Sequence, residues 1–419
     1  MAKNQLLTVV FEGEEIGLLG YDENLKKSSF QYNPSFLKTN KWLNLFPLII
    51  RRIQLTQVFS QFHSDTFRGL PPLFADSLPD MFGNIIFKTW METTSKDFES
   101  ISVLEQLAYI GNRGMGALEY HPSKKVPLDA TIDISEMAHL VKQVLEQKQS
   151  TFEDSMNHAA LLTIFKIGSS AGGMRPKILV SENIATGAIV PGDLLTDIYH
   201  RHYLVKLDIG DQKGYSREVV EYCYWLAAKS VGIDMMDAKL IDNKHFATLR
   251  FDRMNGSKIH TLTVSGLTGL DYTKPADSAY ENIFDLMLFL KCPHKDVEQL
   301  FRRMVFNLVF ANHDDHLKNH SFVYNSDTDA WRLGPAYDLT YSLNPELNFL
   351  NHSRALSING KRVDILWKDV EAVAKKYAVK QYKKVIQEIQ DTIPFFVKSA
   401  LSHGVPKRIV DLMQRRMMG

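Results

Sequence analysis

Cysteine is scarce in this sequence, and so are long apolar segments. The 419 residues contain two cysteines, Cys223 and Cys292, which lie far apart and in no metal-binding spacing. This scarcity excludes a disulfide-stabilised extracellular domain and favours a reducing, cytoplasmic compartment. No run of eighteen consecutive apolar residues occurs, so we expect no transmembrane span and no membrane partner. The opening residues also lack the apolar core of a signal peptide, and we expect none.

Net charge is also nearly absent. Lys and Arg total 49 against 48 for Asp and Glu, which gives a formal net charge of +1. A chain without a strong overall field is a poor candidate for direct binding to nucleic acid, so we expect any DNA contact to be made through a partner. The hydrophobic fraction of 45% and charged fraction of 23% are typical of a globular protein. The length predicts two or three folding units.

The expected elements change in character along the chain. Residues 5–33 read as a β-meander, and residues 67–83, rich in Pro, Gly and aromatics, as an ordered but irregular connection. An apolar stripe at helical spacing predicts a helix over 135–148. Strand patterns dominate from about 160 to 275, interrupted by one helix over 216–232.

Helices are expected to dominate the remainder of the chain. The segment 296–316 carries an apolar face at helical spacing, and 321–339 reads as a β-hairpin. In the last hundred residues, Ile386, Ile389 and Ile393 form one stripe. We therefore predict an α+β, two-lobed, protein-kinase-like fold with a β-rich N-terminal part and a mainly helical C-terminal lobe. The predicted domains are 1–120 (N-terminal subdomain), 121–255 (kinase N-lobe region) and 256–419 (helical C-lobe).

The segment "NHDDHLKNHSF", residues 312–322, concentrates groups that bind metals and move protons. Phosphoryl transfer needs a carboxylate that orients the acceptor hydroxyl and ligands for Mg²⁺. Asp314 and Asn319 have the five-residue spacing of a kinase catalytic loop, and Asp338 follows after the hairpin. These oxygen ligands suit Mg²⁺ better than Zn²⁺. Lys318 can neutralise phosphate charge, and His316 can support the loop or contact the phosphate.

Two other interpretations of the same segment remain open. Three histidines with an aspartate can form the site of a metal-dependent hydrolase, because spacings of three and four residues converge on one face of a helix. The residues concerned are His313, His316 and His320 with Asp314 or Asp315. An isolated D-x-x-x-x-N is also often only a polar turn.

Upstream segments supply the other parts of a kinase, in kinase order. "KIGSSAGGMRPKILV", residues 166–180, is a Ser/Gly loop whose N–H groups can hold phosphate oxygens, although it lacks the P-loop pattern. Lys206 follows on an apolar strand, and Glu218 and Glu221 lie on the next predicted helix, where either can pair with it. The segment "LRFDR" can link the lobes, with Leu249 to Phe251 lining an adenine pocket; otherwise it is a strand end with a surface Arg–Asp pair.

At these residues the sequence resembles the HipA family of serine/threonine kinases, toxins of bacterial type II toxin–antitoxin systems. The motifs that carry the resemblance are "FRGLPPLFADSLPDMFG", "GSSAGGMRPK", "YLVKLD", "LRFDR", "NHDDHLKN" and "AYDLT". The resemblance implies that Asp314 is the catalytic base, that Asn319 and Asp338 are the Mg²⁺ ligands and that Lys206 binds the ATP phosphates. It also implies autophosphorylation of the Ser/Gly loop at Ser169, with Ser170 as the alternative. The loop residues expected at the nucleotide are Ser169, Ser170, Ala171, Gly172 and Gly173.

The resemblance further implies ATP and Mg²⁺ as cofactors and a helix-turn-helix, HipB-like antitoxin as partner. An aminoacyl-tRNA synthetase is the implied type of protein substrate. The residues themselves leave open a catalytically silent kinase-fold module that binds an antitoxin–DNA complex, and the metal hydrolase described above.

Overall fold

The computed structural model describes residues 5–79, 81–93, 101–123, 133–147, 175–192, 197–210, 214–343 and 353–418. The chain divides into two compact units, one of residues 1–210 and 247–261 and the other of residues 211–246 and 262–419. The predicted domain limits at 120 and 255 stay a prediction. Within the described ranges, no helix combines the length and apolar character needed to cross a membrane.

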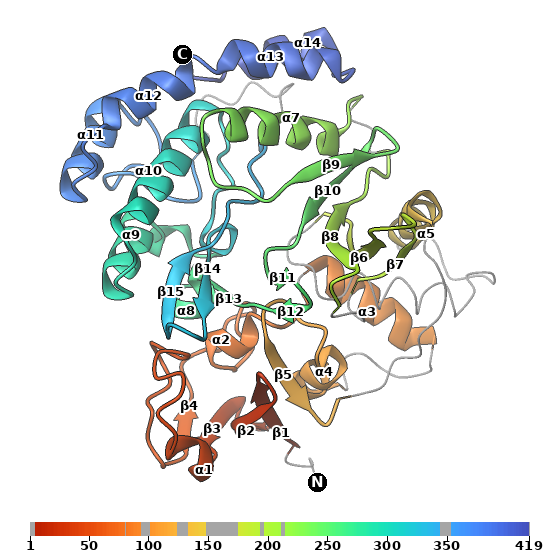
Figure 1. Ribbon diagram of the computed structural model, residues 1–419, viewed down its shortest axis with the longest axis vertical. Helices are drawn as coiled ribbons and strands as arrows, with labels where there is room; N and C mark the ends of the chain where they lie inside the picture. The colour runs from red at the N-terminus through yellow and green to blue at the C-terminus, as the bar shows by residue number, and fades with distance from the viewer. Residues whose placement is uncertain are drawn as a thin grey trace. The chain divides into compact units, whose positions relative to one another are not determined.

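The first unit opens with an antiparallel sheet whose strand order is β4-β3-β2-β1-β5 (Figure 1). Its strands are β1 (Gln5–Phe11), β2 (Glu14–Asp22), β3 (Lys27–Tyr32), β4 (Gln57–Phe59) and β5 (Leu118–His121). Alternate residues of β1, Leu7, Val9 and Phe11, are buried, as the two-residue period of a strand requires. The helix α4 (Val103–Ile110) packs against β1, β2 and β5. The predicted β-meander is therefore confirmed.

An aromatic cluster fills the core beneath this sheet. Phe30 of β3 lies 5.3 Å from Phe74 and 6.1 Å from Phe46 between ring centroids, and Tyr32 lies 5.0 Å from Phe30. Phe74 belongs to the short helix α2 (Pro72–Ala75), inside the segment 67–83 expected to be irregular. The expectation of an irregular segment is therefore wrong in part, because α2 forms and the helix α3 (Met81–Thr93) begins before residue 83. The helix α1 (Pro34–Leu37) precedes this region.

The second sheet has the strand order β7-β6-β8-β10-β9. Its strands are β6 (Lys177–Asn183), β7 (Ile189–Pro191), β8 (His200–Lys206), β9 (Ala238–Ile241) and β10 (His245–Leu249), and the pair β11 (Arg253–Met254) and β12 (Ser257–Lys258) follows. The predicted helix at 135–148 is confirmed as α5 (Ile134–Gln147). On β8, the buried His202 is hydrogen-bonded to Ser181 of β6 at 2.7 Å.

Two buried histidines of the first unit make its stability depend on pH. Burial lowers the pKa of His260 to about 3, and burial with the charges of Arg250 and Arg253 lowers that of His202 to about 4. Both histidines become charged near pH 6.5 only after unfolding, so stability is complete above pH 6.5 and falls as the pH falls towards these folded-state values. At pH 5 each histidine is expected to cost about 2 kcal/mol of unfolding free energy relative to pH 7.

Urea denaturation of the wild type and of His260→Leu between pH 7 and 5 checks this expectation. The pH dependence of the variant's unfolding free energy should be smaller than that of the wild type by roughly the contribution of one histidine. Equal slopes for the wild type and His260→Leu would contradict the assignment.

The second unit is mainly helical. The predicted helix at 216–232 is α7 (Arg217–Ser230), capped by the Ser216 side chain and followed by Gly232 in the left-handed region. The predicted helix that leads to the polar segment is α10 (His294–Val309), and its expected apolar face is buried. The residues of that face are Val297, Leu300, Phe301, Met304, Val305 and Leu308. The predicted hairpin is confirmed as β14 (Ser321–Asn325) and β15 (Ala330–Leu333), which β13 (His260–Thr263) extends to three strands.

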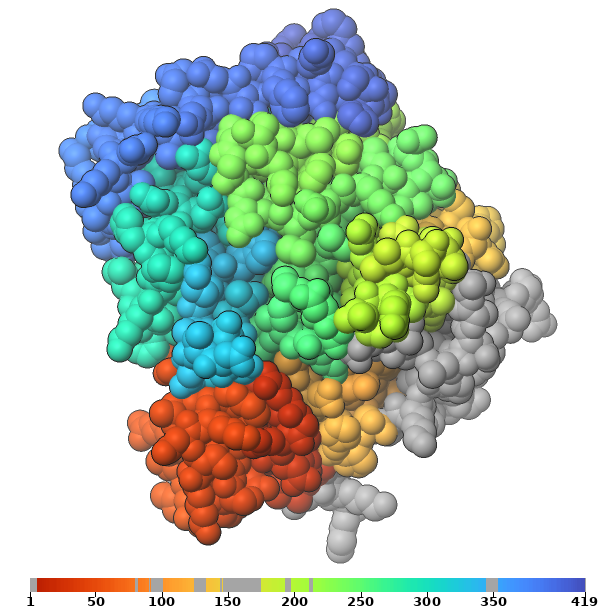
Figure 2. All heavy atoms as spheres, in the orientation of Figure 1, coloured from red at the N-terminus to blue at the C-terminus, as the bar shows by residue number. Residues whose placement is uncertain are grey.

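The helix α13 (Ile393–Ser402) packs on α7, and Figure 2 shows the C-terminal residues in blue beside those of α7 in light green. Tyr224 of α7 lies 5.0 Å from Phe396 of α13 between ring centroids. The expected stripe of isoleucines is split between α12 (Tyr382–Gln390) and α13 (Ile393–Ser402), because Pro394 lacks an N–H group and is accommodated in a first helical turn. The other helices of this unit are α8 (Val264–Thr268), α9 (Tyr280–Phe289), α11 (Trp367–Lys376) and α14 (Lys407–Gln414), with short 3₁₀ turns η2 (Pro275–Asp277) and η3 (Leu317–Asn319).

Candidate functional site

The polar segment 312–320 leaves the end of α10 as a loop, as predicted. Asn312 is buried, and its side chain donates hydrogen bonds to Asn307 Oδ1 at 3.0 Å and to the backbone oxygen of Asp338 at 3.3 Å. The backbone N–H of Asn312 also donates to Asn307 O at 3.0 Å. Asn312 therefore joins the loop after α10 to the segment that follows β15.

Asp314 and Asn319 lie close together within this loop. The Asn319 side-chain amide donates to the backbone oxygen of Asp314 at 2.8 Å, and the Asn319 N–H donates to His316 O at 2.8 Å. Leu317, at the start of η3, is fully buried and anchors the turn, whereas Asp314 is exposed. This arrangement leaves the Asp314 carboxylate accessible from solvent on a loop with a fixed backbone.

Asp338 lies in the same small pocket as Asn319. The pocket is also lined by Asn312 and Asp315. The backbone of Asp338 is left-handed, with φ of +55°, a conformation that costs a non-glycine residue free energy and that Asn and Asp tolerate better than most. The structure thus brings together the two residues expected to bind a metal ion, although 19 positions separate them in the sequence.

His316 and Lys318 share an aromatic neighbour, Tyr272. The Tyr272 ring lies 4.9 Å from the His316 ring between centroids, and the Lys318 Nζ lies 5.3 Å from the Tyr272 centroid. Burial lowers the pKa of His316, while the negative charges of Asp314 and Asp338 act in the opposite direction. His316 and Lys318 are thus both placed against the Tyr272 ring.

The histidines do not converge in the way that a metal hydrolase requires. His320 is buried with its ring 5.6 Å from the Tyr280 ring, and burial lowers its pKa to about 3. His313 is held through its backbone, which donates to Ser342 Oγ at 2.7 Å. In the part of the chain that the structure describes, no three His, Cys, Asp or Glu side chains are placed to hold a metal ion.

A buried ion pair next to the loop was not predicted from the sequence. Asp315 accepts hydrogen bonds from Arg354 Nη2 at 2.9 Å and from the Tyr280 hydroxyl at 2.7 Å, and both charged side chains are almost fully buried. Arg354 also donates to the backbone oxygen of Asn312. Since Ala355 N donates to His313 O at 2.8 Å, residues 354 and 355 hold the backbone on the N-terminal side of Asp314.

We expect Arg354→Met to lower the free energy of unfolding by about 3 to 5 kcal/mol, because the substitution leaves the Asp315 carboxylate buried without its cation. The matched control is Lys375→Met, which removes one partner of the exposed Lys375–Glu371 pair and should leave the free energy of unfolding nearly unchanged. Chemical denaturation of both variants measures the difference. Similar stabilities would show that Asp315 does not depend on Arg354.

The first unit contains Lys206 where it was expected, at the end of the buried strand β8. Lys206 pairs across the sheet with Lys177 of β6, and both are buried. Residues directly opposite each other in a sheet project to the same face, where two like charges oppose folding. No functional role was predicted for Lys177, although it follows the Ser/Gly loop directly in the sequence.

The remaining predicted nucleotide residues lie in several places. Leu249 ends β10 and Phe251 follows it, both half-buried, on either side of a buried Arg250. The alternative interpretation of this segment, a surface Arg–Asp pair, is wrong, because the side chains of Arg250, Asp252 and Arg253 are all buried. Glu218 and Glu221 are buried on α7 in the second unit, so their pairing with Lys206 stays a prediction. The loop residues Ser169, Ser170, Ala171, Gly172 and Gly173 lie outside the described residues.

Comparison with known families and structures assigns both parts of the chain. Residues 7–121 match the HipA N-terminal domain, and residues 169–395 match the HipA-like C-terminal domain. A curated relative, "Putative kinase Y4dM" of Sinorhizobium fredii, is 26% identical over 213 residues, which cover 46% of this chain and 50% of that protein. The chain thus spans about half the length of this relative.

A solved structure supports the fold over nearly the whole length. It comes from a complex described as the Shewanella oneidensis toxin–antitoxin system HipA, HipB and its operator DNA. The superposition on that chain has a TM-score of 0.64, and the two chains are 15% identical. The match covers 98% of this chain and 96% of that one. The predicted fold, β-rich in its N-terminal part and helical in its C-terminal part, is confirmed. On the two domain matches, this chain belongs to the HipA family.

Proposed function

We propose that this protein is an ATP- and Mg²⁺-dependent protein serine/threonine kinase of the HipA toxin type. The observation that carries the proposal is the pocket lined by Asn319 and Asp338, with Asn319 hydrogen-bonded to the backbone of the exposed Asp314. A base, an amide ligand and a carboxylate ligand are the groups that a kinase supplies to phosphoryl transfer.

The donor set of the pocket fits Mg²⁺. Proteins bind this ion through one or two carboxylates together with substrate phosphates and water, rather than through a complete protein cage. Asp338 would supply the carboxylate and Asn319 the amide oxygen. When bound, Mg²⁺ neutralises charge on the phosphates of ATP. The lack of a three-residue cluster of His, Cys, Asp or Glu among the described residues fits this ion better than it fits Zn²⁺.

Asp314 is the group that we assign to the acceptor. Its carboxylate would accept a hydrogen bond from the serine or threonine hydroxyl and take its proton as the phosphoryl group is transferred. Lys318 would balance negative charge on the transferred group, and His316 would hold the loop against Tyr272.

The nucleotide would be bound by residues of the first unit. Lys206 is assigned to the ATP phosphates, and the buried Lys177 lies opposite it in the sheet. Leu249 and Phe251 are assigned to the adenine base. We further assign Glu221 to the pairing with Lys206, and the loop Ser169 to Gly173 to the phosphates.

The finer features of the proposal follow the family. The substrate would be a cytoplasmic protein, with an aminoacyl-tRNA synthetase as the leading type, and the protein would autophosphorylate at Ser169 or Ser170. Its partner would be a HipB-like helix-turn-helix antitoxin, and the near-zero net charge supports DNA contact through that partner alone. The related Shewanella structure contains HipB and operator DNA.

Incubation of the pure protein with labelled ATP and Mg²⁺, followed by phosphosite mapping, tests the proposal. Phosphoserine at 169 or 170 is the expected result. Nucleotide binding without any phosphoprotein, free phosphate or activity towards candidate substrates would identify a silent binding module. Released phosphate without phosphoprotein would instead indicate a hydrolase.

A further inference from the structure

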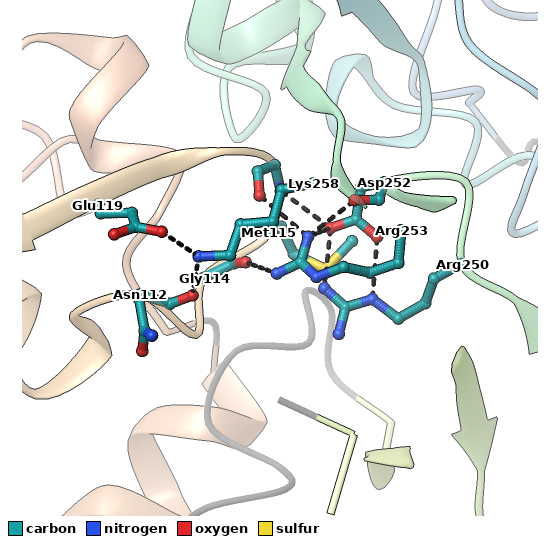
Figure 3. A network of polar contacts seen from close by, with 9 residues as sticks. Asn112, Gly114, Met115, Glu119, Arg250, Asp252, Arg253 and Lys258 are labelled. Atoms are coloured by element: carbon teal, nitrogen blue, oxygen red, sulfur yellow. Dashed lines mark hydrogen bonds and ion pairs between the residues drawn. The ribbon is translucent and has the colours of Figure 1, made fainter. Parts of the chain in front are cut away.

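A buried cluster of charges follows β10 in the first unit (Figure 3). Asp252 Oδ1 accepts a hydrogen bond from Arg250 Nε at 2.9 Å, and Asp252 Oδ2 accepts from Arg250 Nη2 at 2.8 Å and from Arg253 Nη1 at 2.9 Å. The three side chains are 0 to 4% exposed. Burial alone would raise the pKa of Asp252, but the two guanidinium groups hold it well below its usual range, so this carboxylate stays charged.

The cluster binds the backbone of a loop in the N-terminal domain, residues 112–117, between α4 and β5. Gly116 N donates to Asp252 Oδ2 at 2.9 Å, and Arg253 donates to the backbone oxygens of Gly116 at 3.0 Å and Gly114 at 2.9 Å. These contacts cross 136 to 139 positions of sequence. The charges therefore connect the HipA N-terminal domain to the segment expected to contact adenine.

The loop approaches so closely because of Gly116. This residue has a φ of +75°, and a Cβ added to it would lie 2.9 Å from the backbone oxygen of Thr261. At the outer edge of the same contact, Lys258 binds Asn112 O and the Glu119 carboxylate, both at 2.5 Å. The loop 112–117 is therefore closely packed at Gly116, and the Lys258–Glu119 ion pair lies at one side of this contact.

The segment 249–251 is held from two directions. Arg250 N donates to His202 O of β8 at 2.9 Å, four residues before Lys206 on the same strand. The Arg250 side chain is held by Asp252, and through it by the loop at Gly116. The half-buried Leu249 and Phe251, on either side of Arg250, have their backbone fixed by these two anchors.

We propose that Asp252, with Arg250 and Arg253, positions the Leu249–Phe251 segment for the base of the nucleotide. The loop 112–117 of the N-terminal domain then contributes to nucleotide affinity without touching the nucleotide. The inference rests on the proposed function, because it assigns a positioning role within the same nucleotide site. Asp252 is a positioning residue and takes no part in phosphoryl transfer.

Two variants disturb the contact between Asp252 and the loop 112–117, one on each side of it. Asp252→Asn removes the charge that orders both arginines, and Gly116→Ala pushes the loop away from Thr261. The matched control for the second is Gly187→Ala, since Gly187 has a φ of +72° but no atom within 4 Å of its added Cβ. Far-UV circular dichroism and urea denaturation of the full chain establish the folded fraction of each variant.

Titration with a fluorescent ATP analogue measures the dissociation constant of the folded fraction, and steady-state kinetics measures KM for ATP and kcat. Both contact variants should raise the dissociation constant and KM about tenfold, corresponding to about 1.4 kcal/mol of binding free energy, and leave kcat at saturating ATP within about twofold. Gly187→Ala should bind as the wild type does. A purely structural role would lower the folded fraction without changing the affinity of the molecules that remain folded.

The possible outcomes distinguish failure of the positioning role from failure of the proposed kinase function. A wild type that does not bind nucleotide would overturn both. Wild-type binding together with unchanged affinity in folded Asp252→Asn and Gly116→Ala would overturn only the positioning role. If Asp252→Asn does not fold, Gly116→Ala and Arg253→Lys decide, and wild-type affinity in both would overturn the inference.

Discussion

Asp314→Asn is expected to lower the rate of phosphorylation by at least about a hundredfold while leaving folding and ATP binding unchanged. The substitution keeps the size of the side chain and removes the group that would take the proton of the acceptor hydroxyl, a contribution of about 10² to 10⁴ in rate. Folding should not change because Asp314 is exposed, and Asn319 binds its backbone oxygen rather than its carboxylate. Initial rates with labelled ATP, normalised to the folded fraction, provide the measurement.

Asp327→Asn is the matched control, because it removes another exposed carboxylate, from the turn of the β14–β15 hairpin. It should phosphorylate at the wild-type rate. Wild-type turnover by Asp314→Asn would show that another group is the base, and a loss of turnover in both variants would point to a general effect of surface charge.

Asp338→Asn is expected to weaken the affinity for nucleotide in the presence of Mg²⁺ by about tenfold or more, and to leave the affinity without Mg²⁺ nearly unchanged. Even residues that only orient metal ligands change metal affinity by about 10- to 100-fold when they are replaced. Asn is preferable to Ala here because it tolerates the φ of +55° at this position. The hydrogen bond from Asn312 should persist because it is accepted by the backbone oxygen of Asp338.

Isothermal titration with ATP, with Mg²⁺ and with a chelator, separates the two affinities. Asp364→Asn serves as control, since Asp364 is exposed in the same unit and has a φ of +51°. Its titrations should match those of the wild type. A Mg²⁺ dependence that survives in Asp338→Asn would remove this residue from the metal site.

The parts of the fold that local pattern determines could be predicted. The apolar face of α10 was visible because a helix buries residues three and four positions apart, and the hairpin after it was visible as two apolar runs around a polar turn. The spacing of Asp314 and Asn319 likewise reflects a local structure, the short turn η3. For this reason Asp314 and Asn319 could be chosen from the sequence as candidate site residues.

The parts that depend on distant contacts could not be predicted in the same way. Nothing in the sequence near Asp315 indicates that Arg354, 39 positions later, will pair with it. Likewise, nothing near Asp252 indicates that the backbone of Gly116 will donate a hydrogen bond to its carboxylate. In both cases tertiary pairing with a distant residue buries the charges. The break between α12 and α13 was different, since Pro394 could have indicated it.

The order of synthesis bears on the first unit, because strand β1 pairs both with its neighbour β2 and with the distant β5. The hairpin of β1 and β2 needs only about twenty residues of emerged chain, and such local pairing forms quickly. The edge of β1 facing β5 must wait for residues 118–121. The backbone groups at Gly114 and Gly116 must wait longer, until Asp252 and Arg253 have left the ribosome. By then residues 211–246, which belong to the second unit, have also emerged. The first unit is therefore completed only after part of the second unit has emerged, so a chain stalled before residue 250 exposes the backbone groups of Gly114 and Gly116 to chaperones and proteases.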